Sequence, residues 1–141
     1  MQIHDISISL LREYDNNPRN NDGAVDAVAA SIREFGFKVP VIVDGDNVIV
    51  AGHTRVKAAR ELGMETVPCI IADDLTPEQV RAFRLADNKT AELAGWDFEK
   101  LMQELTALES FDMDAFGLIH CRKYRIMWRQ LTSILMQNGI A

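Results

Sequence analysis

Apolar and polar positions divide the first half of the chain into a helical segment and several short strands. Apolar residues at intervals of three and four between Val25 and Phe35 predict an amphipathic helix that ends near Gly36. Near-alternation of Ile with polar residues predicts a first strand over 3–8, and β-branched runs predict three more over 39–43, 48–51 and 67–72. The pattern is that of a chain with both strands and helices.

Three further helices are predicted, over about 54–62, from Thr76, and from about Asp97. The sequence Thr76-Pro77-Glu78-Gln79 is typical of a helix start, because a Thr hydroxyl and a Gln amide can satisfy the free backbone groups there. This helix is expected to turn Val80, Phe83 and Leu85 inward and to break near 87–88. Trp96 and Phe98 are expected in the core rather than as a base-stacking platform.

Length and composition favour one compact globular domain. Of 141 residues, 48% are hydrophobic and 26% are charged, which excludes a disordered or low-complexity chain. No apolar run approaches the ~20 residues that span a bilayer, and the start of the chain has no secretory pattern. Cys69 and Cys121 form neither a disulfide framework nor a metal-ligand spacing. We therefore expect a cytoplasmic protein with no membrane segment.

Charge is distributed unevenly along the chain. Residues 1–118 hold all 21 acidic residues and 11 of the 15 basic ones, a net charge of −10, whereas 119–141 hold four basic residues and no acid. We expect a body over 1–118 and a basic C-terminal helical tail over 119–141. Three interpretations of the tail stay open: a helix packed on the body, a basic helix facing a partner or membrane surface, and a terminus foreign to the rest.

The segment with the most chemistry is Gly52-His53-Thr54-Arg55-Val56-Lys57, which directly follows a predicted strand and opens a helix. Backbone N–H groups and the positive end of the helix dipole meet at such a junction, so it can bind an anion. Gly52 lets a phosphate approach the backbone, while Arg55 and Lys57 add positive charge. Thr54 can cap the helix or donate a hydrogen bond to phosphate. The spacing alone equally fits an ordinary junction with a solvated basic turn.

His53 is the candidate catalytic residue of this segment. An imidazole can act as a base or as a metal ligand near neutral pH. It can also donate a hydrogen bond to phosphate or backbone without any catalytic role. Both interpretations stay open on the sequence.

Several segments together resemble the N-terminal domain of ParB chromosome-partition proteins and the wider ParB/sulfiredoxin superfamily. The segments that match the family's motifs in order are Asn17-Pro18-Arg19, the helix end over 31–36 with the strand over 39–43, the strand–helix junction over 52–59, and Ala86-Asp87-Asn88. The resemblance covers more than half of the chain. It is strongest to ParB-type domains found with phage, mobile-element and DNA-modification methyltransferase proteins.

The resemblance implies an α+β fold, a small mixed β-sheet with packed helices, and a nucleotide site. It places Gly52, Arg55 and Lys57 at the phosphates, Asn88 at phosphate or metal, and Arg19 near the same pocket. Asp87, next to Asn88, becomes the candidate metal ligand. A hard cation such as Mg²⁺ takes one or two carboxylates together with phosphate oxygens.

The chain departs from the family pattern at two places. His53 and Thr54 stand where ParB has Glu and Arg, and Lys89-Thr90-Ala91 replaces a segment that carries an arginine clamp. These departures leave open the choice between CTP and ATP, hydrolysis, and whether the chain is an enzyme. His53 also takes the position of the sulfiredoxin nucleophile, so sulfiredoxin activity is not expected.

Three functions follow as hypotheses. The first is a ParB-like nucleotide-binding domain of a DNA-associated system (partition, mobile-element or DNA-modification), a switch or weak NTPase that binds a nucleoside triphosphate, CTP or ATP, with Mg²⁺. The second is a metal-dependent ParB-like nuclease, with Asp87 as its metal ligand. The third is a non-catalytic recognition module for a DNA methyltransferase. DNA or a DNA-processing protein is the expected partner, and a homodimer is one expected assembly.

Overall fold

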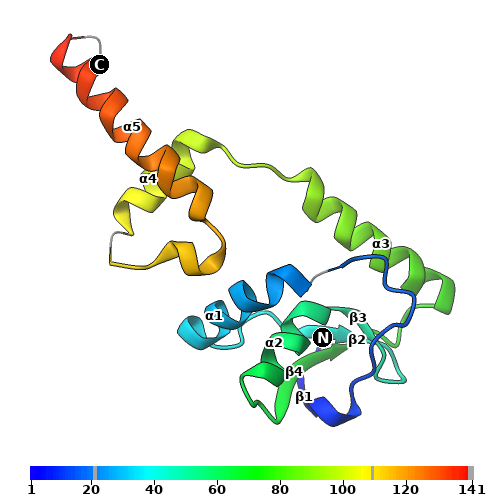
Figure 1. The fold of residues 1–141 in the computed structure, drawn as a ribbon. Helices are drawn as coiled ribbons and strands as arrows, with labels where there is room; N and C mark the ends of the chain where they lie inside the picture. The colour runs from blue at the N-terminus through cyan, green and yellow to red at the C-terminus, as the bar shows by residue number, and fades with distance from the viewer. Residues whose placement is uncertain (21, 109, 140–141) are drawn as a thin grey trace. The chain divides into compact units, whose positions relative to one another are not determined.

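A computed structural model describes residues 1–20, 22–108 and 110–139, and it divides the chain into two compact units, Met1–Ala94 and Gly95–Ala141 (Figure 1). The predicted boundary at 118 therefore falls inside the second unit. Each unit has a hydrophobic core of its own, and each is described separately below.

The first unit contains a four-stranded mixed sheet, as the resemblance implied. Its strands are β1 (His4–Ser7), β2 (Val41–Val43), β3 (Ile49–Ala51) and β4 (Thr66–Ile71), in the spatial order β1-β4-β2-β3. The β2–β4 pair is parallel, and the other two pairs are antiparallel. The segment after β1 extends the sheet beyond β3, because Arg12 forms a parallel bridge with Val48. The predicted strands over 39–43, 48–51 and 67–72 are thus confirmed.

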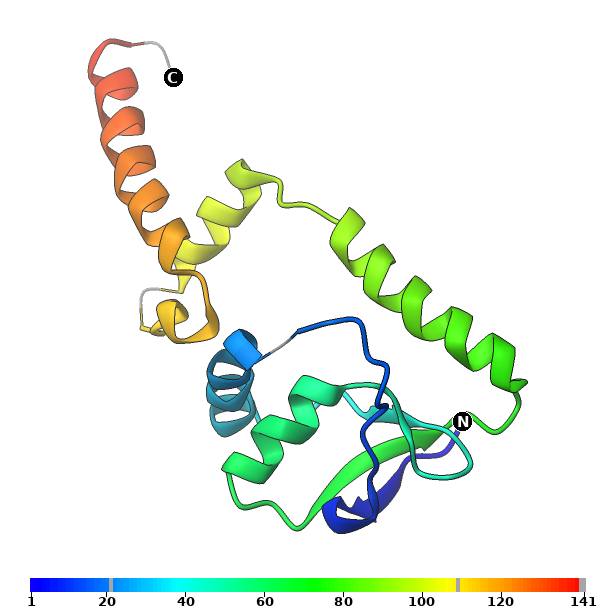
Figure 2. The same ribbon diagram turned by 45° about the vertical axis from the view of Figure 1, so that its right-hand side comes forward.

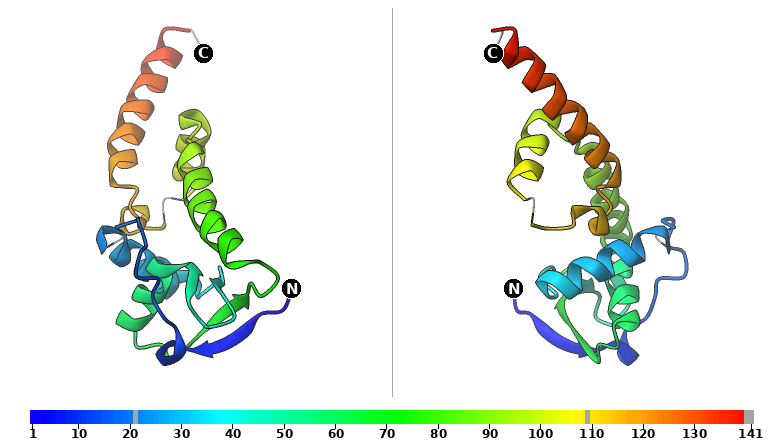
Figure 3. Two further views of the ribbon diagram at one scale, coloured as in Figure 1. Left: turned by 90° about the vertical axis from the view of Figure 1, so that its right-hand side faces the viewer. Right: turned by 60° about the vertical axis from the view of Figure 1, so that its left-hand side comes forward.

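Two helices and the sheet enclose the core of this unit. Helix α1 (Val25–Phe35) packs against α2 (His53–Glu61), and the two lie side by side in Figure 3. Val56 and Ala59 of α2 meet the sheet, and they are fully buried with its side chains Val41, Val43, Ile49, Val67 and Cys69. This packing fixes the start of α2 at the end of β3. Two short 3-10 turns, Ile8–Leu10 and Asp22–Ala24, complete the N-terminal segment.

Helix α3 (Pro77–Leu93) is longer than predicted and extends away from the sheet (Figure 2). The break expected near 87–88 is wrong, because polar side chains there bond within the helix instead of interrupting it. Asn88 Nδ2 donates to the Arg84 carbonyl at 2.9 Å, and Thr90 Oγ1 donates to the Ala86 carbonyl at 2.9 Å. Leu85, expected inside, is 58% exposed.

The predicted cap of α3 is confirmed and provides a stability test. Thr76 Oγ1 accepts from the Gln79 amide at 3.2 Å, and Gln79 Oε1 accepts from the Thr76 amide at 2.9 Å. Thr76→Ala is expected to lower the free energy of unfolding by about 1 kcal/mol, measured by urea unfolding. Thr90→Ala is the matched control, because its hydroxyl adds no cap. Equal losses in the two variants would contradict a capping role.

The second unit is helical. It comprises α4 (Phe98–Ala107), a 3-10 turn (Met113–Phe116) and α5 (Ile119–Gln137). Its core consists of the buried α4 residues Leu101, Met102 and Leu105, against which Met113 and Leu118 pack. The side chains of 119–126 and 128 lie outside the described residues, and no helix in the described part is long and apolar enough to cross a membrane.

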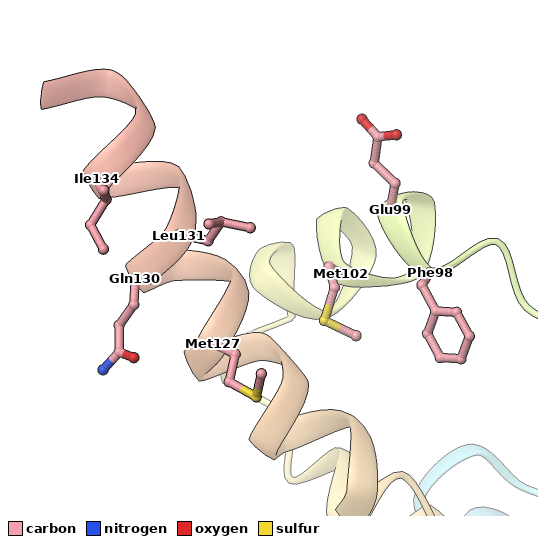
Figure 4. Close-up of a pocket in the computed structure, with 7 residues that line it drawn as sticks. All are labelled: Phe98, Glu99, Met102, Met127, Gln130, Leu131 and Ile134. Carbon is pink, nitrogen blue, oxygen red and sulfur yellow. The ribbon is translucent and has the colours of Figure 1, made fainter. Parts of the chain in front are cut away.

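Two aromatic side chains of the second unit, Trp96 and Phe98, lie outside its core. Trp96 is 65% exposed and Phe98 is 59% exposed, so the expectation that both are buried is wrong. Phe98 instead borders a groove of about 570 Å³ between α4 and α5 (Figure 4). The other residues that line it are Glu99, Met102, Met127, Gln130, Leu131 and Ile134.

Candidate functional site

The centre of the candidate site is the junction where β3 leads into α2. Gly52 has φ +107°, a left-handed conformation that favours glycine, and it precedes the first helical residue. Arg55 folds back over this glycine, so that a Cβ added to Gly52 would lie 3.0 Å from Arg55 Nη2. The junction therefore holds one guanidinium directly against a bare backbone.

Arg55 is a half-buried cation, and not all N–H donors of its guanidinium form hydrogen bonds. Its Nη2 donates to the Pro40 carbonyl at 3.0 Å, and its buried Nε has no hydrogen-bond partner among the described residues. Burial lowers the pKa of Arg55, and the charge of Asp87 opposes that shift. A guanidinium with an unsatisfied N–H beside the first turn of a helix is suited to bind an anion.

A polar cleft of about 300 Å³ opens beside this junction. Its lining residues are Glu13, Tyr14, Asp15, Asn17, Arg19, Asn20, Asp22, His53 and Lys57. Three of the predicted site residues, Arg19, His53 and Lys57, are thereby brought to one cleft, although 38 positions separate the first from the last.

His53 enters the cleft as a neutral imidazole. Its Nε2 accepts a hydrogen bond from the Tyr14 amide at 3.4 Å, which places the ring proton on Nδ1. Burial lowers the pKa of His53, and the positive charge of Arg84 lowers it further. The ring can therefore donate from Nδ1, while its basic nitrogen is already engaged.

The lowered pKa of His53 makes stability depend on pH. As the pH falls through about 6.5, the unfolded chain takes up a proton on this residue while the folded chain resists it. The free energy of unfolding is therefore expected to fall toward mildly acidic pH, and His53→Gln should remove that part of the slope. NMR titration of the ring gives its pKa directly, and a value at or above 6.5 would contradict the observed environment.

The cations of the cleft are held by partners from other segments. Lys57 Nζ lies 2.8 Å from Asp22 Oδ1, and this hydrogen bond raises the pKa of Lys57. Arg19 Nη1 donates to Asn88 Oδ1 at 3.0 Å, which joins two predicted site residues that are 69 positions apart. Both contacts are exposed, so a bound anion can replace them at small cost.

Two predicted site residues, Thr54 and Asp87, have no side-chain partner like those of Lys57 and Arg19. Thr54 is half-buried, and its hydroxyl makes no hydrogen bond within the described residues. Asp87 is exposed, and the described part of the chain holds no group of three or more His, Cys, Asp or Glu side chains that could bind a metal. A hard cation at Asp87 would therefore take most of its ligands from phosphate oxygens and water.

Comparison with known proteins identifies the family. Residues 1–89, more than half of the chain, match the ParB N-terminal domain. The chain belongs to the ParB N-terminal domain family. This assignment covers both the Gly52 junction and the first three turns of α3, which carry the site.

Two relatives show how far the ParB likeness extends. The chain is 41% identical over 70 residues to the ParB-like nuclease domain-containing protein YnaK of Escherichia coli, covering 49% of this chain and 80% of that protein. It is 30% identical over 139 residues to the probable chromosome-partitioning protein ParB of Vibrio cholerae, covering 94% of this chain and 45% of that protein. The chain therefore spans less than half the length of this partition protein.

The ParB fold is also found among solved structures. The chain matches the C-terminally truncated chromosome-partitioning protein ParB of Caulobacter crescentus, complexed with CTP-γ-S, with a TM-score of 0.65 and 23% identity. The match covers 83% of this chain and 66% of that chain. At this identity the likeness establishes the fold.

Arg84, which no sequence motif singles out, lies behind the cleft of this ParB-family chain. It is 3% exposed, and its Cζ lies 3.6 Å from the centre of the Tyr14 ring. Its spacing does carry a signal, because Val80, Arg84 and Asn88 recur every four residues and so share one face of α3. An apolar stripe alone does not predict that a charged residue lies on this inward face.

Proposed function

We propose that this chain is a nucleoside triphosphate-binding domain of a DNA-associated system, with the phosphates bound where β3 meets α2. The observation that carries the proposal is the half-buried Arg55, which lies against Gly52 with an unsatisfied Nε. The first amides of α2 and the guanidinium together offer donors and positive charge to phosphate oxygens. Family membership supports the same assignment.

CTP is the first ligand to test and ATP the second. The support is the Caulobacter ParB structure, which is complexed with CTP-γ-S and shares this fold. Mg²⁺ would be bound by the phosphates, with Asp87 as the protein ligand. Arg19, Lys57 and Asn88 would exchange their present contacts for the nucleotide, and Thr54 would donate its hydroxyl to a phosphate.

Calorimetric titration of the full chain with CTP, ATP, GTP and ADP, each with Mg²⁺, tests this proposal. Saturable binding of one triphosphate is expected, with weaker binding of the diphosphate because it offers fewer oxygens to Arg55. Absence of binding for all four nucleotides would contradict the proposal. A recognition module that serves a separate DNA methyltransferase would then take its place.

Lys57→Ala is expected to weaken triphosphate binding less than a change at Arg55. The Lys57 ammonium is a point charge near the surface, where water and salt replace part of its contribution. A loss of about threefold to tenfold in affinity is expected, measured by calorimetry. Lys38→Ala, which removes an exposed cation outside the cleft, is the control. An effect of Lys57→Ala no larger than that of the control would exclude Lys57 from the site.

Hydrolysis and nuclease activity need separate assays. A weak NTPase would use the Nδ1–H of His53 to orient water, because Nε2 already accepts from the Tyr14 amide, so His53→Ala should reduce turnover while leaving affinity nearly unchanged. The nuclease hypothesis draws on the YnaK relative, and plasmid cleavage with Mg²⁺ or Mn²⁺ that a chelator abolishes would support it. A cytoplasmic setting, a DNA or DNA-processing partner from a partition, phage or mobile-element system, and a homodimer belong to the same proposal.

A further inference from the structure

Arg84 is a cation shielded from water; burial lowers its pKa most, and the negative charge of Asp44 opposes that shift without forming an ion pair with it. Its guanidinium is covered by the Tyr14 ring, and no ion pair to it occurs among the described residues. Its Nη2 donates to the Ile49 carbonyl at 3.2 Å, whereas its Nε is buried and has no partner in the described part of the chain. Such an arrangement costs free energy, and an apolar side chain of similar length would avoid the cost.

The contacts of Arg84 join three segments that build the cleft. Its hydrogen bond to the Ile49 carbonyl fixes β3, the strand that leads directly into Gly52. Through the ring of Tyr14 it holds the wall opposite α2. On α3 its own carbonyl accepts from Asn88, whose Oδ1 in turn accepts from Arg19.

The same contacts lead to His53. The Tyr14 residue whose ring lies on Arg84 donates its amide proton to His53 Nε2. The Arg84 side chain thus sets the position of Tyr14, which lines the cleft. The bond from Asn88 goes to the backbone carbonyl of residue 84, so it does not depend on the Arg84 side chain. A shift of the Tyr14 backbone would release the imidazole ring.

We propose that Arg84 is a positioning residue of the nucleotide site: its side chain holds Tyr14 against His53 at the cleft. The part of this proposal that concerns ligand affinity rests on the proposed function, whereas the part that concerns His53 does not. Arg84 itself touches no ligand in this arrangement.

The charged groups around His53 allow a direct readout. Arg84 and Lys57 lower its pKa, Glu13 raises it, and burial lowers it most. Removal of Arg84 takes away one positive charge and loosens the Tyr14 amide, which bonds only the neutral ring. Both effects raise the pKa of His53, so the direction of the shift is unambiguous.

The test compares Arg84→Met with Arg84→Lys and with Arg81→Met, an exposed position on the same helix. For each variant the His53 pKa is measured by NMR, the CTP affinity by calorimetry with Mg²⁺, and the fold by a thermal melt. We expect Arg84→Met to raise the His53 pKa and to weaken CTP binding about tenfold. Arg84→Lys keeps the charge but loses the planar contact with Tyr14, so it should reverse only part of the rise in the His53 pKa and restore only part of the affinity.

Each outcome decides between alternatives. An unchanged His53 pKa in Arg84→Met, with the CTP affinity of Arg81→Met, would overturn the positioning role. Should Arg84→Met fail to fold, Arg84→Lys decides, because wild-type affinity in that folded variant would equally overturn the role. Wild-type protein that binds no nucleotide would contradict the proposed function, while a His53 pKa that is raised in Arg84→Lys, where the positive charge is kept, would still support the link from Arg84 through Tyr14.

Discussion

Replacing Arg55 with alanine is expected to weaken nucleoside triphosphate binding by about tenfold to a hundredfold. The guanidinium lies against Gly52 with one buried donor unsatisfied, and a phosphate at the start of α2 would take that donor. Truncation removes both the charge and the planar donor set. Calorimetry with CTP and ATP in the presence of Mg²⁺ measures the loss.

The structure also gives Arg55 a role in the fold, so the comparison needs controls. Its bond to the Pro40 carbonyl fastens the segment before β2, and alanine should lower the free energy of unfolding modestly. Arg55→Lys keeps the positive charge but lacks the planar N–H donors of the guanidinium. Arg33→Ala is the control, because it removes an exposed charge on α1. An Arg55→Ala protein that binds every nucleotide as tightly as Arg33→Ala does would show that the phosphate site lies elsewhere.

Gly52→Ala is expected to damage stability and binding together. A left-handed backbone costs a residue with a Cβ about 1–2 kcal/mol, and here the φ is +107°. The added Cβ would also lie 3.0 Å from Arg55 Nη2 and 3.3 Å from Val41 Cγ2, so the guanidinium has to move. Urea unfolding measures the first effect, and calorimetry with CTP measures the second.

Gly45 provides the matched control for this substitution. It lies in the turn between β2 and β3, where an added Cβ meets nothing within 4 Å and φ is not in the left-handed range. Gly45→Ala should therefore keep both stability and affinity near their wild-type values. Equal behaviour of the two variants would mean that the close approach of Arg55 to Gly52 has no role in binding.

The elements of the sheet could be predicted from local sequence, but their order could not. The β-branched segments around Val41, Ile49 and Val67 became strands because such side chains pack well on a pleated, buried surface. The parallel pairing of β2 with β4 joins segments that have all of α2 between them. No local pattern encodes that choice, and the family resemblance implied a mixed sheet without giving its strand order.

The same division between local and distant information holds for the site. Gly52, Arg55 and Lys57 are neighbours in sequence, and one strand–glycine–helix junction sufficed to single them out. The contact of Arg84 with Tyr14 and the bond from Arg19 to Asn88 each join residues about 70 positions apart. Only the packing of α3 beside β3 brings those groups together. No sequence pattern within either segment predicts that packing.

Two separate cores in one chain have a consequence for how unfolding is measured. The buried clusters around Val56 and Ala58 draw only on residues up to Ile71, and the cluster around Leu101 draws only on residues from there to Leu118. Cooperativity extends as far as a shared core, so heat or urea can melt the two units in separate transitions. A single midpoint from far-ultraviolet circular dichroism, to which helices of both units contribute, would average them. Both tryptophans, Trp96 and Trp128, belong to the second unit, so tryptophan fluorescence follows that unit alone and assigns the remaining transition to the first.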